Sequence, residues 1–329
     1  MPLLSWNRAA LPKAPMPMRE SAADFDSVDA GYPGADGRKP PRGERTLLPA
    51  LPVPRQGLFE TCANPRCGTG RLKLWRSRRA PVFEGGWCCS AACMRAQVES
   101  ALSRELDTRG GAPRNRPHRI PLGLAMLEQG WITAEQLRGA LEAQKAAGAG
   151  RLGMWLVRRK AASEEQVTRA LGWQWSCPVL GLEFHQPEAM TPLLPRLFVD
   201  AFAALPLRVA AGRILYLGCE DRPDPVLALS VERMTGLHVE SGLVQGSLFR
   251  PAHARMLSAR FPRSALAEIE SGASLTSALL ESVERKRPLD ARLVRVHGFL
   301  WLRLWHRPQL GPTPELDSIE DLIFSTSAH

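Results

Sequence analysis

Four cysteines in the first third of the chain have the spacing of a metal-binding site. Cys62 and Cys67 form a C-x4-C pair, and Cys89 and Cys93 form a C-x3-C pair. Thiolates at such spacing are common ligands of tetrahedral zinc, and a site with four of them leaves no coordination position open for catalysis. We therefore expect a structural Zn2+ ion held by these four side chains. Cys88 adjoins Cys89 and could replace it as the third ligand.

These ligands need elements that bring two separated pairs together. The apolar runs Leu72–Trp75 and Val82–Trp87 predict two short strands joined by a basic turn, and the pattern from Ser90 to Asp107 predicts a helix. Cys89 and Cys93 then lie one helical turn apart and can face the same ion. The segment 58–107 resembles treble-clef and MYM/FCS-type zinc fingers, which implies a small zinc-binding domain.

Most of the excess positive charge lies around the cysteines. The formal net charge of the chain is +10, and residues 55–119 contain thirteen Lys and Arg against five Asp and Glu, a balance of +8. The patch that could contact nucleic-acid phosphates consists of Arg71, Lys73, Trp75, Arg76, Arg78 and Arg79. The alternative is a solvated hairpin surface, because the sequence shows no second finger and no clear base-reading helix. Residues 108–119, rich in Gly, Pro and Arg, are predicted to form a linker.

A second signal is a short pattern that occurs twice at an offset of 30 residues. Both copies open on Leu-Gly and close on a helix that ends in Gln. The matched positions include Leu122/Leu152, Gly123/Gly153 and Gln144/Gln174. Thr133–Gln136 and Ser163–Gln166 are capping boxes, each of which predicts a helix start. Apolar residues at helical spacing follow each box, so the repeat predicts two equivalent helical units.

The repeat also carries a family resemblance. The residues concerned are the Leu-Gly openings, Gly130, Ile132-Thr133, Gln136-Leu137, Gln144 and Arg151-Leu152-Gly153, followed by Leu205–Val209, Arg213–Leu217, Asp224-Pro225, Arg233, Gly236 and Val239. On these residues, the segment 120–258 resembles the N-terminal domain of the bacterial type II secretion and type IV pilus assembly ATPases, the GspE N-terminal or MshEN family. The pattern after the repeats predicts a small mixed α/β half, with a hairpin turn at Ala211-Gly212.

This resemblance implies two ways in which the segment works. Some members of the family bind cyclic di-GMP through the tandem motifs, and others dock onto a platform protein of the secretion or pilus machinery. The resemblance implies that a nucleotide would bind at Leu122, Gly123, Gln144, Arg151, Leu152, Gly153 and Gln174. Two positions depart from the pattern, because Pro121 stands where Arg is expected and Lys160 matches Gly130. One half-site therefore lacks its cation.

The two ends of the chain give weaker signals. Residues 1–57 are rich in Pro, Gly and charge, which predicts a disordered tail. In residues 259–329 we expect a helix at Ala265–Glu284, a strand or hairpin at Leu293–Trp305, and a frayed tail over the last 20 residues. The side chains expected to share one face, either for a partner or for packing, are Trp301, Arg303 and Trp305.

Enzymatic motifs are missing from the sequence. It has no G-x-x-x-x-G-K-[ST] phosphate loop, no G-x-S-x-G elbow and no H-E-x-x-H motif. We see no signal peptide and no apolar run of about 18 residues, so we expect no membrane insertion and a cytoplasmic location.

The sequence thus predicts an α+β protein with a disordered tail, a zinc finger, a tandem helical repeat with a mixed α/β half, and a short C-terminal segment. We expect a non-catalytic adaptor that acts through protein contacts, with a component of the secretion or pilus machinery as the implied partner. The alternatives are a cyclic di-GMP receptor and a zinc-finger protein that binds nucleic acid.

Overall fold

The computed structural model of the chain describes residues 61–68, 82–107, 120–183, 185–269 and 272–326. The predicted disordered tail, the strand at Leu72–Trp75 and the linker at 108–119 lie outside these ranges. Helices and strands are both present, which confirms the α+β class. Buried apolar side chains gather in three cores. The head core includes Met126 and Leu156, the central core includes Leu193 and Phe198, and the metal-side core, which lies beside the four cysteines, includes Met94 and Leu279.

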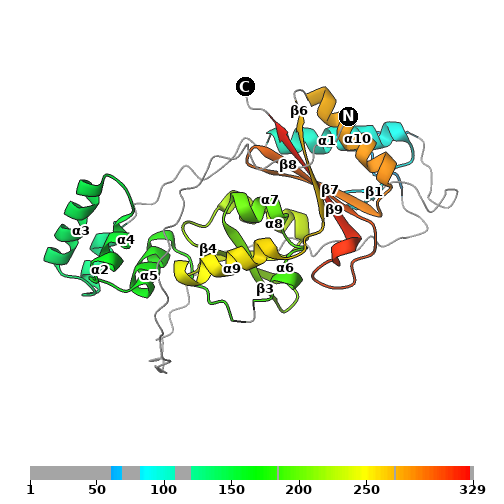
Figure 1. The fold of residues 1–329 in the computed structure, drawn as a ribbon. Helices are drawn as coiled ribbons and strands as arrows, with labels where there is room; N and C mark the ends of the chain where they lie inside the picture. The colour runs from blue at the N-terminus through cyan, green and yellow to red at the C-terminus, as the bar shows by residue number, and fades with distance from the viewer. Residues whose placement is uncertain (1–60, 69–81, 108–119, 184, 270–271, 327–329) are drawn as a thin grey trace, which may run out of the picture.

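The tandem repeats form a separate helical unit, the head, which comprises residues 120–176 (Figure 1). Its helices are α2 (Leu122–Glu128), α3 (Ala134–Ala147), α4 (Leu152–Arg158) and α5 (Glu164–Trp175). Both capping boxes are confirmed. The Thr133 hydroxyl accepts the Gln136 N–H at 3.2 Å, and the Ser163 hydroxyl accepts the Gln166 N–H at 3.1 Å. Each glutamine side chain accepts the N–H of its capping residue in return, at 2.8 Å.

The two Leu-Gly openings are required by close packing inside the head. A Cβ atom on Gly123 would lie 2.7 Å from Leu137, and one on Gly153 would lie 2.6 Å from Val167. Leu137 and Val167 occupy equivalent positions in the two copies. Because any side chain on either glycine would displace an apolar neighbour, the repeat pattern records the packing of this core.

A three-stranded sheet with its helices follows the head. Strands β3 (Ala204–Ala210), β4 (Ile214–Cys219) and β5 (His238–Leu243) lie in that order, β3 antiparallel and β5 parallel to β4. The helices are α6 (Pro187–Met190), α7 (Arg196–Ala201), α8 (Pro225–Thr235) and α9 (Gly246–Ser258). Ala211 and Gly212, both at positive φ, make the predicted hairpin turn.

The C-terminal region is a four-stranded sheet with one helix. Its strands are β6 (Arg263–Ile269), β7 (Asp290–Val296), β8 (Phe299–Trp305) and β9 (Ile319–Thr326), in the order β6-β9-β8-β7, with α10 (Gly272–Lys286) after β6 and a 3-10 turn, η2 (Leu316–Ser318), before β9. The predicted hairpin around Gly298 is confirmed. The helix expected at Ala265–Glu284 is wrong in its first part, because β6 occupies those residues.

The prediction of a frayed tail over the last 20 residues is also wrong for Ile319–Thr326, which form strand β9. Strand β9 lies inside the sheet, between β6 and β8. Asp321 on β9 faces Arg303 on β8, and each side chain is only 1% exposed. Arg303 donates to both carboxylate oxygens at 2.7 and 2.8 Å, and the Trp301 indole donates to the same carboxylate at 2.7 Å. Asp321, one of the acidic residues of this segment, is therefore paired inside the protein.

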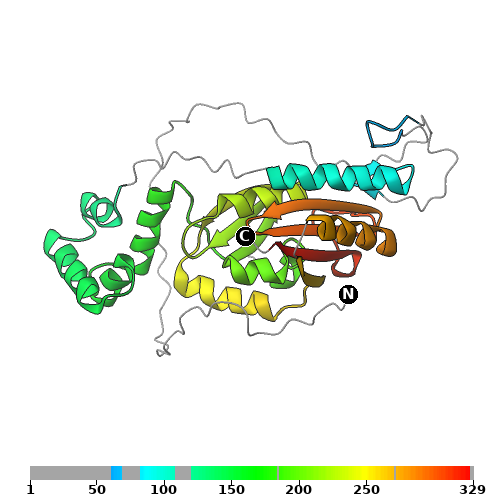
Figure 2. The same cartoon turned by 90° about the horizontal axis from the view of Figure 1, so that it is seen from above.

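The four-stranded sheet separates the central core from the metal-side core. Trp301 and Trp305 of the predicted Trp-Arg-Trp face pack in the central core, whereas Leu300, Leu302 and Leu304 pack in the metal-side core. This alternation follows from the two-residue period of a strand. Helices α1 (Ala91–Asp107) and α10 cover the metal-side face (Figure 2). The cysteine segment therefore shares a core with residues 275–324.

A short hairpin attaches the cysteine segment to the sheet. Val82–Trp87 is not the single strand that its apolar pattern predicts, because Glu84 and Gly85 take positive φ angles and turn the chain between β1 (Val82–Phe83) and β2 (Gly86–Trp87). The Glu84 N–H donates to the Ala291 carbonyl at 2.6 Å, and the Gly85 N–H donates to Asp290 at 2.9 Å. The hairpin thereby covers part of the edge strand β7.

The described residues outside the head are here called the body, and one buried carboxylate connects three of its elements. Glu105, near the end of α1, is 0% exposed. Arg233 of α8 donates to both of its oxygens, Arg104 donates at 2.9 Å, and the Arg295 N–H of β7 donates at 3.0 Å. Burial by itself raises the pKa of Glu105, but these donors outweigh it and leave the pKa below its ordinary value.

Replacing Glu105 tests how strongly this carboxylate holds the body together. Glu105→Ala should lower the free energy of unfolding by about 2 kcal/mol, because it leaves Arg233 and the Arg295 N–H without their acceptor. Urea unfolding at neutral pH measures this loss. Glu99→Ala removes an exposed carboxylate from the same helix and should have little effect.

The same carboxylate should also give the protein an acid-sensitive stability. Because the folded pKa lies below the ordinary value of 4.5, the stabilisation is present above that pH and is lost as the pH falls through the folded pKa. Glu105→Gln should be less stable at neutral pH and should lose less stability on acidification. Equal acid sensitivity in both proteins would contradict a role for Glu105.

Candidate functional site

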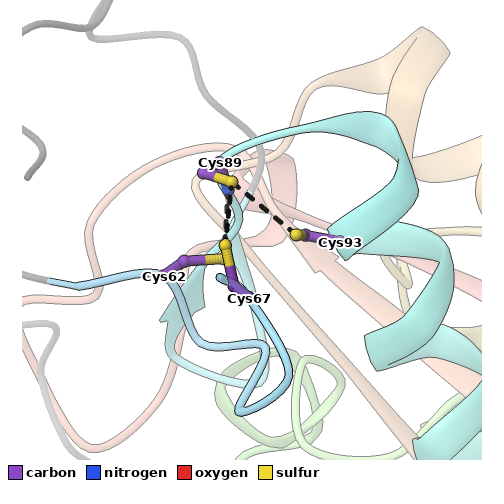
Figure 3. Close-up of side chains that lie close together, drawn as sticks. All are labelled: Cys62, Cys67, Cys89 and Cys93. Carbon is purple, nitrogen blue, oxygen red and sulfur yellow. Dashed lines mark hydrogen bonds between the residues drawn. The ribbon is translucent and has the colours of Figure 1, made fainter. Parts of the chain in front are cut away.

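The four predicted zinc ligands converge at one point (Figure 3). Cys62 and Cys67 come from the loop before the hairpin, Cys89 precedes α1, and Cys93 lies in its first turn. Their four sulfur atoms all lie within 4.8 Å of one another. The Cys67 and Cys89 sulfurs are 3.5 Å apart, and those of Cys89 and Cys93 are 3.6 Å apart. Ligands of tetrahedral zinc at a Zn–S distance of about 2.3 Å lie about 3.8 Å apart, so the group fits such an ion.

Hydrogen bonds from neighbouring groups orient the sulfur atoms. The Cys89 N–H donates to the Cys62 sulfur and the Asn64 amide to the Cys93 sulfur, each at 3.4 Å. The Ser90 hydroxyl accepts the Cys93 N–H at 3.2 Å and so caps the start of α1. Gln97 donates to the Ala63 carbonyl at 2.7 Å, which fixes the loop against the helix. Such partners are typical of metal centres, where they hold the ligands in place.

The surroundings affect the individual thiols differently. Burial raises the pKa of Cys62 to about 11, although the N–H of Cys89 opposes this change. Hydrogen bonds from Ser90 and Asn64 lower the pKa of Cys93. A bound cation favours the thiolate form of every ligand and would offset the burial of Cys62. With four thiolates the site is closed, so its chemistry would be structural.

The structure distinguishes the two adjacent cysteines that the sequence left open. Cys89 contributes its sulfur to the group. Cys88 is 1% exposed and packs in the metal-side core, where burial raises its pKa to about 12. A thiol in that environment stays protonated and behaves as a small apolar side chain.

The repeat glutamines make reciprocal contacts between the two copies. Gln144 of the first copy donates to the Gly150 carbonyl at 2.8 Å, just before α4. Gln174 of the second copy donates to the Ile120 carbonyl at 3.1 Å, just before α2. Residues 120 and 150 are themselves equivalent in the repeat. Each glutamine therefore fastens the start of the other copy, and the head has an approximate two-fold arrangement.

The other residues implied for a nucleotide are divided between the core and the surface. Leu122, Leu152 and the two glycines pack around the head core. Arg151 is 74% exposed and forms an ion pair with Asp221 of the body. The role of the implied residues in nucleotide binding stays a prediction.

The two positions that depart from the family pattern keep the backbone of their counterparts. Pro121 and Arg151 precede α2 and α4 with similar extended backbones, at ψ 139° and ψ 150°. Lys160 has φ +56° and its counterpart Gly130 has φ +67°, so the left-handed turn is kept despite the side chain. The departures therefore change the charge at these points and leave the backbone course in place.

The head also exposes large apolar side chains, including Leu141, one of the apolar residues at helical spacing after the first capping box. They are Ile120 at 55%, Leu124 at 54%, Leu141 at 46%, Met154 at 37% and Trp173 at 51% exposed. Leu124 and Met154 are equivalent in the repeat. The sequence marks both positions, because each directly follows Leu-Gly, but only the structure shows that the two side chains are exposed.

The basic patch proposed for nucleic acid falls on residues 71–79, outside the described ranges, and stays a prediction. Among the described residues, every helix is too short or too polar to cross a membrane.

Comparisons with known proteins give partial likenesses. No protein-family model and no curated protein matches this sequence. The structure of MshE with cdg is 27% identical over 42% of this chain and 99% of its own, with a TM-score of 0.33. Two crystal forms of the XpsE N-terminal domain are each 22% identical, cover 41% and 40% of this chain and 92% and 90% of their own, and have TM-scores of 0.30 and 0.24. TM-scores this low do not establish a shared fold.

The adjacent cysteines provide a direct test of the metal centre. Cys89→Ser should remove the bound metal, because it replaces one of the four converging thiolates. Cys88→Ala should retain it, because the Cys88 sulfur is not among the four that converge. Elemental analysis of protein purified with added zinc should find one metal ion per chain for the wild type and for Cys88→Ala. Retention by Cys89→Ser together with loss by Cys88→Ala would overturn the assignment.

Proposed function

We propose that this protein is a non-catalytic adaptor whose head docks onto a protein partner, while a structural zinc ion helps to hold the body rigid. The observation that carries the proposal is the exposed apolar surface of the head. Among the described residues, five of the eleven large apolar side chains with high exposure lie in the head. Scattered apolar side chains are normal on a surface, but their concentration on one unit is typical of a binding surface.

The position of the head supports this reading. Helices α2, α3 and α4 lie at one end of the molecule in both views (Figures 1 and 2). The head has its own core and its own internal hydrogen bonds, so it can present this surface independently of the body. The partner implied by the sequence resemblance is a component of the type II secretion or type IV pilus machinery.

The zinc ion would act through the body. Its ligands bring together the cysteine loop and α1, and α1 in turn packs on the C-terminal sheet. Zinc fits the four sulfur donors and the closed site. Bound there, it would stabilise the metal-side core as well as the loop, because folding and metal binding are coupled.

Charge substitutions on the head test the docking surface. Leu141→Lys should weaken binding about tenfold, because it places a charge in an apolar contact. Ala146→Lys adds the same charge to an exposed position of α3 and should leave affinity unchanged. The measurement is calorimetric titration with the purified cytoplasmic domain of a secretion or pilus platform protein from the same organism. Equal binding by both variants would contradict this surface, and no binding by the wild type would contradict this partner.

A second candidate is a cyclic di-GMP receptor, favoured by the approximate two-fold arrangement of the head. The ligand is itself two-fold symmetric, with two guanines and two phosphates. The head has two equivalent helix starts, those of α2 and α4, with which the phosphates could interact. Arg151 supplies a cation before α4, and Pro121 occupies the equivalent position before α2. A phosphate would have to compete with Asp221 for Arg151.

Restoring the missing cation tests this second candidate. Pro121→Arg should raise the affinity for cyclic di-GMP about tenfold by adding a charge-assisted contact. Arg151→Ala should abolish the binding seen by calorimetry. If neither the wild type nor Pro121→Arg gives heat at high micromolar ligand, the head does not bind this nucleotide.

A further inference from the structure

The contacts between head and body that the structure describes include several polar ones. Arg151 of the head pairs with Asp221, and the Arg222 guanidinium lies 4.9 Å from the ring centre of Trp175. The head packs its apolar side chains in the head core, and the adjoining half of the body packs its own in the central core. Helix α5 also lies beside β5. Polar contacts between exposed groups are individually weak, so among the polar contacts those with several well-formed hydrogen bonds contribute most to the orientation of the head.

Glu164 makes the best-defined of these contacts. It is the first residue of α5, and its carboxylate reaches the start of α9 in the body. One oxygen accepts the Ser247 N–H at 2.9 Å, and the other accepts the Gln245 side-chain amide at 3.0 Å. In both views α5 lies beside one end of α9 (Figures 1 and 2).

The first turn of α9 gives this contact a physical reason. A helix start leaves N–H groups without acceptors inside the helix, and a nearby side-chain oxygen usually accepts them. Here a carboxylate from 83 residues earlier in the chain accepts the Ser247 N–H. The positive end of the helix dipole favours the negative charge as well. The head thus supplies a cap that belongs to a helix of the body.

The charges around the cap also favour the ionised carboxylate. Burial alone raises the pKa of Glu164, but the donors Gln245 and Ser247 and the charge of Arg250 leave it below its ordinary value. Arg250 itself donates to Glu220 at 2.7 Å, which keeps the guanidinium beside the start of α9. The carboxylate is therefore charged at neutral pH.

The repeat supplies an internal comparison. The residue equivalent to Glu164 in the first copy is Ala134, whereas Glu165 has Glu135 as its counterpart. Glu165 pairs with Arg169 on its own helix. The acid at 164 is therefore absent from the shared pattern that builds the head, and its described contacts reach the body.

We propose that Glu164 is a latch that fixes the head on the body. When its carboxylate caps α9, the head has one orientation. When the contact is lost, the head turns about the short connection after α5, where Ser176 has φ +53° and Cys177-Pro178 follows. This device does not depend on what the head binds.

Distance measurements between head and body test the latch. Spin labels attached to a genetically encoded keto amino acid at Ala146 and at Arg213, both exposed, leave the seven cysteines unchanged. The distance distribution should be narrow in the wild type. It should broaden in Glu164→Ala and in Glu164→Gln, because neither retains the charged cap. Glu165→Gln removes a charge from the same helical turn and should leave the distribution narrow.

Hydrogen exchange separates release of the latch from unfolding. In Glu164→Ala, amides in the first turn of α9 should exchange about fivefold faster, as expected for loss of a helix cap, while those of β4 and α8 keep their wild-type rates. A narrow distribution in Glu164→Ala, or equal broadening in Glu165→Gln, would overturn the proposal. Faster exchange throughout the body would also overturn it, because the residue would then support the fold as a whole.

Discussion

The buried carboxylate of Glu105 is the constraint on which the body depends. A charge removed from water requires several donors, and here they come from α1 itself, from α8 and from β7. The helix that begins at the cysteine group is thus held at its other end by a network that reaches two further parts of the chain. Because few other arrangements satisfy this buried charge, the network favours one placement of α1 against α8 and β7.

The C-terminal sheet lies between the central core and the metal-side core. Its strands alternate side chains between the central core and the metal-side core, so both layers require it. The pair formed by Arg303 and Asp321 lies within this sheet, where its geometry fixes the register of β8 on β9. A buried pair of this kind adds little net stability but disfavours a shifted register, because a shift would leave both charges unpaired.

The head follows a different principle. Its glycines and glutamines are used to pack and fasten the two copies on each other, which explains why the pattern is repeated. The large apolar side chains that do not fit into this core are left exposed on the surface of the head. The head is joined to the rest of the chain through a short connection after α5 and through the polar contacts of Arg151 and Glu164.

The sequence by itself determined the features that depend on short spacing. The ligand spacing within each cysteine pair, both capping boxes and the hairpin turn at Ala211-Gly212 were predicted because their physics acts over a few residues. Contacts between distant residues were decided only by the tertiary structure. An acidic C-terminal segment became a buried strand because Arg303 lies opposite Asp321. The structure also places the sulfur of Cys89, and not that of Cys88, in the four-cysteine group. Glu164 had no local signal either, since the helix end that it caps lies more than eighty residues away in sequence and adjacent in space.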